Sequence, residues 1–265
     1  MSPYQRIACL STEAVEVMYA LGLEDLVVGI SGYTTRPVRA RAEKPKISGF
    51  SSAKIERILA VQPDLVIAYS NMQAAVCAEL VAAGVEVHAY NQRDVAGIFR
   101  MISSLACLLD KRIEGQQLCA ALRAKISMVE QQSSAWTRRP KIYFEEWNEP
   151  LMAGIGWVSD LIELAGGTDV FADLAVHHSA KQRIIADPLE VVRRAPDIII
   201  GSWCGKKFQP AALAARPGWS AIPALRNACV FEIKSADILS PGPAAIEHGL
   251  LAIHALIADW QAQNC

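Results

Sequence analysis

Short apolar runs alternate with segments of helical periodicity along most of the chain. Two of these runs, Leu65–Tyr69 and Ile198–Gly201, each follow a Pro-Asp pair, and before each pair an aliphatic doublet closes a predicted helix. Apolar runs of this length are typical of parallel strands that are buried on both faces. Because such strands alternate with helices, the pattern predicts an α/β fold with parallel sheets that helices cover on both faces.

The same order of elements occurs twice. In each half, a strand leads to a helix that glycine stops, at Gly22 or at Gly166-Gly167. An irregular stretch, a second helix, Pro-Asp and another strand follow in both halves. A single turn of this kind is common in any α/β protein, but the repeated order favours two similar lobes with a cleft between them.

A long helical segment separates the two halves. It runs from about Asp94 to Ser134, with a break at Asp110-Lys111. The part after the break spans about 33 Å at 1.5 Å per residue, roughly the width of a small domain. One apolar face of this part carries Leu118, Leu122, Ile126 and Val129 at helical spacing.

This pattern predicts three regions in the chain. We expect an N-terminal lobe at residues 1–93, linking helices at 94–139 and a C-terminal lobe at 140–265. The long backbone helix lies at about 112–133 within the linking region. Because this helix would act as a rigid strut, we expect free and ligand-bound forms to differ by a small lobe rotation.

Composition narrows the classes of function. The chain has 265 residues, of which 52% are hydrophobic and 20% charged, with a net charge of −1. Such a chain can build a large core, and its charge argues against nucleic acid or an anionic membrane surface as the main partner. No apolar run reaches the roughly 18 residues that a membrane span requires.

The first residues and the cysteines bear on the cellular compartment. The apolar run Ile7–Leu10 is too short for the core of a signal peptide, so we expect a cytoplasmic protein; it would be periplasmic only if the true start lies upstream. Seven cysteines, an odd number without a C-x-x-C pair, favour free thiols.

Aromatic and polar residues recur where the predicted strands end. Ligands of doubly wound sheets bind at these carboxyl ends. Flat aromatic walls with a few polar groups suit a large, planar, partly apolar ligand, although single aromatic residues also cover sheet rims. The candidates are Tyr33, Phe50 and Tyr69 in the first half, and Glu146, Trp147, Trp157, His178, Trp203, Cys204 and Asp237 in the second.

Metal ligation and catalysis find weaker support. His178 and Cys204 are ligand types that transition metals accept, but adjacent His177 points in another direction. Cys204 precedes Lys206 and Lys207, which would lower its pKa. Glu145 and Glu146 diverge on a strand, an arrangement unsuited to paired acid–base chemistry, so no catalytic residue is predicted. The strand ends are poor in Arg and Lys, which favours a ligand of low charge.

Several segments together resemble class III, helical-backbone substrate-binding proteins. The resemblance covers the whole chain and is strongest to the vitamin B12 (corrinoid) and iron-siderophore branch, in a form without a signal peptide. The segments that carry it are Ile47-Ser48-Gly49-Phe50, Ile55-Glu56-Arg57-Ile58, Gln62-Pro63-Asp64-Leu65-Val66-Ile67-Ala68-Tyr69, Gly84-Val85-Glu86-Val87, Glu163-Leu164-Ala165-Gly166-Gly167 and Ala195-Pro196-Asp197-Ile198-Ile199.

The resemblance implies two Rossmann-like lobes joined by the long helix, with the ligand between them. Tyr33, Phe50 and Tyr69 match aromatic positions of the B12 branch, and loops around His178 and Ser235-Ala236-Asp237 would cover the other face. Family members dock on an ABC permease through one Glu per lobe. Glu56 matches the first, whereas Glu190 lies one residue away from the second.

The expected function is therefore non-enzymatic binding of a cobalamin-like corrinoid or a related metal chelate. The protein would be a monomer with no cofactor of its own. One alternative is the iron-siderophore or haem binding component of an ABC importer. An alternative of another class is a cytoplasmic cofactor-processing enzyme or chaperone that uses Cys204 and His178.

Overall fold

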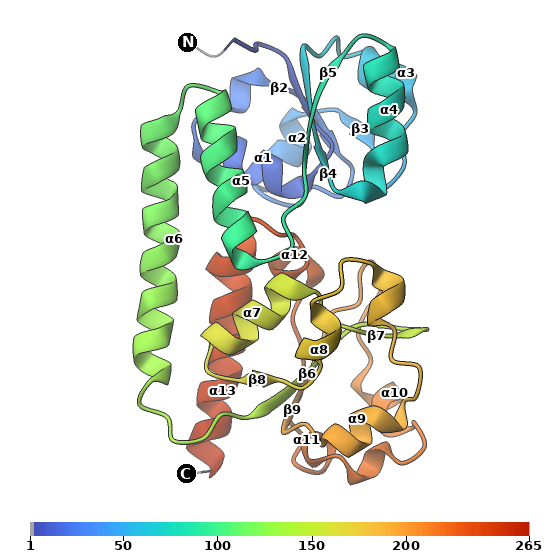
Figure 1. Ribbon diagram of the computed structural model, residues 1–265, viewed down its shortest axis with the longest axis vertical. Helices are drawn as coiled ribbons and strands as arrows, with labels where there is room; N and C mark the ends of the chain where they lie inside the picture. Colours follow the sequence, from blue (N-terminus) through green and yellow to red (C-terminus); the bar gives the residue numbers. More distant parts are fainter. Residues whose placement is uncertain (1–2, 265) are drawn as a thin grey trace. The chain divides into compact units, whose positions relative to one another are not determined.

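The computed structural model describes residues 3–264, which fold into two compact units (Figure 1). Unit 1 comprises the chain up to Gln92 together with Ala96–Ala121. Unit 2 comprises Arg93–Val95 and the chain from Leu122 onward. Each unit is built around its own sheet, so the duplicated α/β organisation that the sequence predicts is confirmed.

The sheet of unit 1 has five parallel strands in the order β3-β2-β1-β4-β5. From β1 the chain adds β2 and β3 on one side and then β4 and β5 on the other, so the strand order switches between β1 and β4. Doubly wound folds bind ligands at such a switch point. The strands are β1 (Ile7–Cys9), β2 (Val27–Ser31), β3 (Lys46–Ser48), β4 (Leu65–Tyr69) and β5 (Glu86–Tyr90).

The apolar side chains of these strands pack against helices that cover the sheet of unit 1. Val66 and Ala68 of β4 pack with Ile58 and Leu80, which come from α3 and α4, on one face. Every residue of β4 is buried, as its all-apolar sequence predicts. The helices of this part of the chain are α1 (Thr12–Ala20), α2 (Ala40–Glu43), α3 (Ile55–Leu59) and α4 (Ala74–Ala82), with short 3₁₀ turns at Glu24–Leu26 and Asn71–Gln73.

Helix α3 begins only at Ile55. Ser51 and Ser52 are residue types that often cap helices, but the residue that precedes the first turn is Lys54, in an extended conformation. The reason is a bridge in which Ala53 pairs antiparallel with Ser48 and so prolongs the edge of the sheet.

The sheet of unit 2 has the order β10-β9-β6-β7, and β8 pairs with the first residues of β6. All pairings are parallel except that of β7, which runs antiparallel beside the end of β6. The sequence predicts a wholly parallel sheet, so the antiparallel pairing of β7 with β6 differs from the prediction. The strands are β6 (Lys141–Asn148), β7 (Leu151–Ala153), β8 (Thr168–Asp169), β9 (Ile198–Gly201) and β10 (Val230–Glu232).

The helices of unit 2 follow the predicted order, with additional short turns. Two of these turns lie in residues 171–185, and three more lie between β9 and β10. They are α7 (Gly156–Leu164), α8 (Ala172–Ala175), a 3₁₀ turn at Ala180–Arg183, α9 (Leu189–Arg194), α10 (Pro210–Ala214), a 3₁₀ turn at Trp219–Ala221, α11 (Pro223–Arg226), α12 (Ser235–Ile238), a π-helical turn at Ala245–Leu250 and α13 (Leu251–Asn264).

Two consecutive helices connect the sheets, α5 (Val95–Leu108) and α6 (Arg112–Ser133), which lie side by side in Figure 1. They approach closely at Gly115, where a Cβ atom would lie 2.3 Å from that of Ala106. Helix α6 runs without interruption over the predicted length. Its residues up to Ala121 belong to unit 1 and those from Leu122 to unit 2.

Helix α6 is also the longest helix in the part of the chain that is described. Its exposed positions are largely polar. Within residues 3–264, no helix combines the length and the apolar character needed to cross a bilayer.

Candidate ligand-binding residues

Two predicted aromatic residues meet at the carboxyl end of the sheet in unit 1. The rings of Tyr33 and Phe50 lie edge to face with their centroids 6.0 Å apart. Both side chains are exposed, Tyr33 by 55% and Phe50 by 41%. Large apolar rings that stay exposed as a pair are available to contact a flat ligand.

Hydrogen bonds fix the loop that carries Phe50. The Gln73 side-chain amide donates to the carbonyl of Phe50 at 2.7 Å, and the Ser31 hydroxyl donates to the carbonyl of Gly49 at 3.1 Å. The aromatic pair therefore stands on an anchored backbone. The third predicted aromatic residue, Tyr69, is buried, and its hydroxyl donates to the carbonyl of Gln92 at 3.4 Å. Its ring is therefore not available at the surface as the other two are.

A buried carboxyl group that sequence reasoning missed lies near the same sheet end. Glu13, in the first turn of α1, is only 3% exposed. It accepts hydrogen bonds from the Gln92 amide and the Thr12 hydroxyl, both at 3.2 Å. Burial raises its pKa from 4.5 to about 7. Glu13 follows β1 directly, at the switch point of the sheet, and position alone could have indicated it.

In unit 2, Glu145 is the centre of a buried polar network. Its carboxylate is fully buried and accepts two hydrogen bonds from the guanidinium of Arg216, at 2.6 and 2.9 Å. The indole N–H of Trp203 and the hydroxyl of Tyr143 donate to it, each at 3.1 Å. Trp203, a predicted ligand-binding residue, is itself buried, so its main contact is this network.

Its neighbour Glu146 is also ion-paired. The guanidinium of Arg183 binds both oxygens of this carboxylate and donates to the carbonyl of Ala153 at 2.7 Å. Arg183 is buried, and the Glu146 side chain keeps about a fifth of its surface exposed. The two carboxylates diverge as the sequence predicts, and each has its own arginine.

The remaining tryptophans have different environments. Trp157 is buried on α7, where its indole donates to the carbonyl of Ile238 at 2.8 Å and so holds α12. Trp147 is partly exposed, and its indole donates to the carbonyl of Glu149 at 2.8 Å. Of the predicted tryptophans in unit 2, Trp147 thus offers the most accessible ring.

His178 and Cys204 are exposed, and Asp237 is half-buried in α12. The expected lowering of the Cys204 pKa is wrong. Although the residue is exposed, partial desolvation of the thiol, followed by the nearby charge of Glu146, raises this pKa above its usual value. Over residues 3–264, no three His, Cys, Asp or Glu side chains gather in a set that could hold a metal ion.

A cation that the prediction did not include lies at this end of the sheet. The ammonium of Lys206 lies 5.2 Å from the ring centre of Trp203 and 5.8 Å from that of Trp147. It donates to the Asn148 side chain at 3.2 Å. Lys206 lies in the loop that follows β9, so this strand end carries a cation.

The two glutamates expected to contact a permease differ in their surroundings. Glu56 is exposed on α3. Glu190 is ion-paired on α9, where Arg193 approaches one carboxylate oxygen at 2.7 Å and Arg194 the other at 2.8 Å. Glu56 is thus the more accessible of the two.

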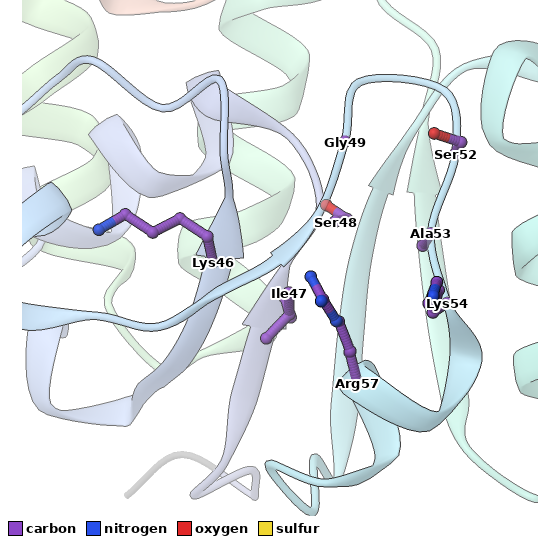
Figure 2. A pocket seen from close by; sticks show the side chains of 8 residues that line it. All are labelled: Lys46, Ile47, Ser48, Gly49, Ser52, Ala53, Lys54 and Arg57. Atoms are coloured by element: carbon purple, nitrogen blue, oxygen red, sulfur yellow. The ribbon is translucent and has the colours of Figure 1, made fainter.

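A basic hollow of about 450 Å³ lies at the edge of the sheet in unit 1, next to the segment that leads to Phe50. Figure 2 shows the Arg57 side chain extending from α3 toward Ile47 and Ser48. Lys46 turns away from it and donates to the carbonyl of Arg41. The lining consists of Lys46, Ile47, Ser48, Gly49, Ser52, Ala53, Lys54 and Arg57, without a carboxylate.

Comparison with known proteins agrees with this architecture. The model of the periplasmic binding protein family matches residues 7–236, most of the chain. The chain belongs to the periplasmic binding protein family. The resemblance to substrate-binding proteins that the sequence motifs indicate is thereby confirmed.

Individual relatives and solved structures share between about a fifth and a quarter of their residues with this chain. The chain is 27% identical over 256 residues to the vitamin B12-binding protein of Vibrio parahaemolyticus, covering 92% of this chain and 86% of the relative. The periplasmic vitamin B12-binding protein of Vibrio cholerae has the same fold, with a TM-score of 0.76 and 21% identity over 97% of both chains. The periplasmic haem-binding protein of a Roseiflexus species matches with a TM-score of 0.79 and 23% identity, over 95% of this chain and 98% of that one.

Proposed function

We propose that this protein binds a cobalamin-like corrinoid or a related planar metal chelate, and that it does so without changing the ligand chemically. The observation that carries this proposal is the exposed pair of Tyr33 and Phe50 at the carboxyl end of a doubly wound sheet. Exposed rings of this kind bury a flat, partly apolar ligand at little entropic cost because their loop is already anchored.

The names of the relatives support the same ligand class. The relative from Vibrio parahaemolyticus is a vitamin B12-binding protein, and the match covers most of both chains. Trp147 of unit 2 contributes a further accessible ring at its own sheet end. We infer that Glu146, His178 and Asp237 act there as polar partners of the ligand rather than as metal ligands.

Substitution of the aromatic pair tests the proposal. The variant Tyr33→Ala/Phe50→Ala and a control, Val38→Ala, are titrated by tryptophan fluorescence with cobalamin, haem and a ferric siderophore. Val38 is an exposed apolar residue without a ring, so the control removes exposed apolar surface but no aromatic contact. The double variant should lose at least about tenfold in affinity for the chelate that the unsubstituted protein binds. Equal affinities for all three proteins would contradict a role of these rings in binding.

A haem or iron-siderophore ligand, delivered to an ABC permease, is the second candidate. The observation in its favour is Lys206, an exposed cation at the sheet end of unit 2. We propose that Glu56, exposed on α3, forms one contact with such a permease. If so, Glu56→Gln should reduce uptake in cells without changing the affinity for the ligand.

Processing of the ligand by Cys204 and His178 is the candidate of another class. The raised pKa of Cys204 favours the protonated thiol at neutral pH, which is a poor nucleophile. We therefore expect ligand recovered after incubation to be unchanged. A modified ligand, formed by the unsubstituted protein but not by Cys204→Ala, would contradict the binding-only proposal.

A further inference from the structure

Lys206 occupies a defined position at the carboxyl end of the sheet in unit 2. Its ammonium lies over the indole rings of Trp203 and Trp147, at 5.2 and 5.8 Å from their centres. Its hydrogen bond to Asn148, at 3.2 Å, places it beside the last residue of β6. Contacts of an ammonium with aromatic faces are attractive and restrict where a flexible lysine side chain lies.

The two tryptophans that Lys206 contacts, Trp203 and Trp147, are fixed by contacts of their own. Trp203 donates to Glu145, and its ring packs against Phe208 with centroids 5.0 Å apart. Trp147 donates to the carbonyl of Glu149. Because both indole N–H groups donate hydrogen bonds, the two rings are fixed in orientation and the Lys206 ammonium contacts a rigid aromatic surface.

The charge of Lys206 is not balanced by a carboxylate. Glu145 is paired with Arg216, and Glu146 with Arg183. Within residues 3–264, no carboxylate oxygen lies within ion-pair distance of the Lys206 ammonium, which donates its hydrogen bond to the neutral amide of Asn148. An ammonium has three N–H donors, so two remain for another acceptor.

We propose that Lys206 is a specificity-determining residue that selects metal chelates with an anionic group, a carboxylate or a phosphate, over otherwise equal neutral ones. The inference rests on the proposed function, since it concerns the same class of ligand. An anionic group placed at the two remaining donors gains a charge-assisted hydrogen bond, while the neutral counterpart gains a weaker one. A solvated lysine without further role would not distinguish the two.

Matched ligand pairs separate these cases. Cobalamin is compared with a derivative in which one side-chain amide is hydrolysed to a carboxylate, and haem with its dimethyl ester. Each pair is titrated into the unsubstituted protein, Lys206→Gln and Lys207→Gln. Lys207 is the matched control because it is an exposed lysine on the same loop.

We expect the unsubstituted protein and Lys207→Gln to prefer the acidic member of at least one pair. Lys206→Gln should lose about tenfold in affinity for that acidic member and little for the neutral one, as expected for loss of one charged hydrogen bond. The preference of the unsubstituted protein should also weaken as salt is added.

Three results would overturn the proposal. An equal loss for both members of a pair in Lys206→Gln would assign Lys206 to the support of the tryptophans alone. No loss for either member would exclude it from recognition. If the unsubstituted protein binds no member of either pair, the proposed function itself fails, and that outcome is distinct from the other two.

Discussion

Glu13 is the residue whose ionisation should be most visible in the stability of the protein. Its folded-state pKa of about 7 lies above the ordinary 4.5 because its carboxyl is buried. Below pH 4.5 both folded and unfolded states hold the proton. Between pH 4.5 and about 7 only the folded state keeps it, so its contribution to stability falls as pH rises and is lost above pH 7.

The variant Glu13→Gln should lack this dependence. The difference in free energy of unfolding between the two proteins should change by on the order of 3 kcal/mol across that window, since each pKa unit corresponds to about 1.4 kcal/mol. Urea unfolding at several pH values measures it. Parallel pH profiles for the two proteins would show that the carboxyl titrates normally in the folded state.

The buried pair of Glu145 and Arg216 should matter for folding more than any exposed pair. Replacing Arg216 by Met leaves the buried carboxylate without its charged partner, which typically costs about 3–5 kcal/mol. The exposed Arg193, paired at 2.7 Å with Asp187, serves as control, and Arg193→Gln should destabilise the protein far less because water screens this pair. Equal costs in thermal or urea unfolding would argue against a buried charge network.

Sequence reasoning found the residues of the candidate site with uneven success, for physical reasons. Tyr33 and Phe50 follow from the rule that loops at carboxyl strand ends carry ligand contacts. Trp157 and Trp203 meet the same rule but are buried, because an indole N–H finds partners in a core as readily as at a surface. The position of Lys206 could not be predicted from the sequence, because its contacts with Trp147 and Asn148 come from β6, which is far from it along the chain.

At the scale of elements, the contact of α5 with α6 gives a test of packing. Gly115→Ala would add a methyl group where Ala106 leaves no room, and overpacking costs about 1–3 kcal/mol. The gain in helix propensity, about 1 kcal/mol, offsets only part of this. We therefore expect a lower midpoint in thermal unfolding.

Exchange of the two residues provides the control. In Ala106→Gly/Gly115→Ala the methyl group moves to the other helix, and the double variant should be more stable than the sum of the two single changes predicts. Simple additivity would contradict a close approach of the helices at this point.

The elements themselves were largely predictable. β4 and β9 have the predicted bounds, and α6 has the predicted length, because apolar runs and long amphipathic faces are strong local signals. The antiparallel strand β7 was missed. It has only three residues, and its pairing depends on the turn at Glu149-Pro150 and on β6 continuing past Glu145. Tertiary pairing of this kind leaves little trace in local periodicity.

At the scale of the whole molecule, the chain has the fold class and the family membership that its sequence motifs indicate. Two α/β units with the predicted duplication, and a family match over residues 7–236, account for most of the chain. Because α6 continues from one unit into the other, we predict a small conformational response to ligand. The radius of gyration from small-angle scattering should change by no more than a few per cent on saturation, and a larger compaction would contradict the strut hypothesis.

The central claim is that the protein binds a planar metal chelate reversibly. Isothermal titration calorimetry of the unsubstituted protein with cobalamin, haem and a ferric siderophore tests it most directly. We predict saturable binding of at least one of them, with the ligand recovered unchanged after dialysis. The absence of saturable binding for all three, by a protein that unfolds cooperatively and is therefore folded, would contradict the account.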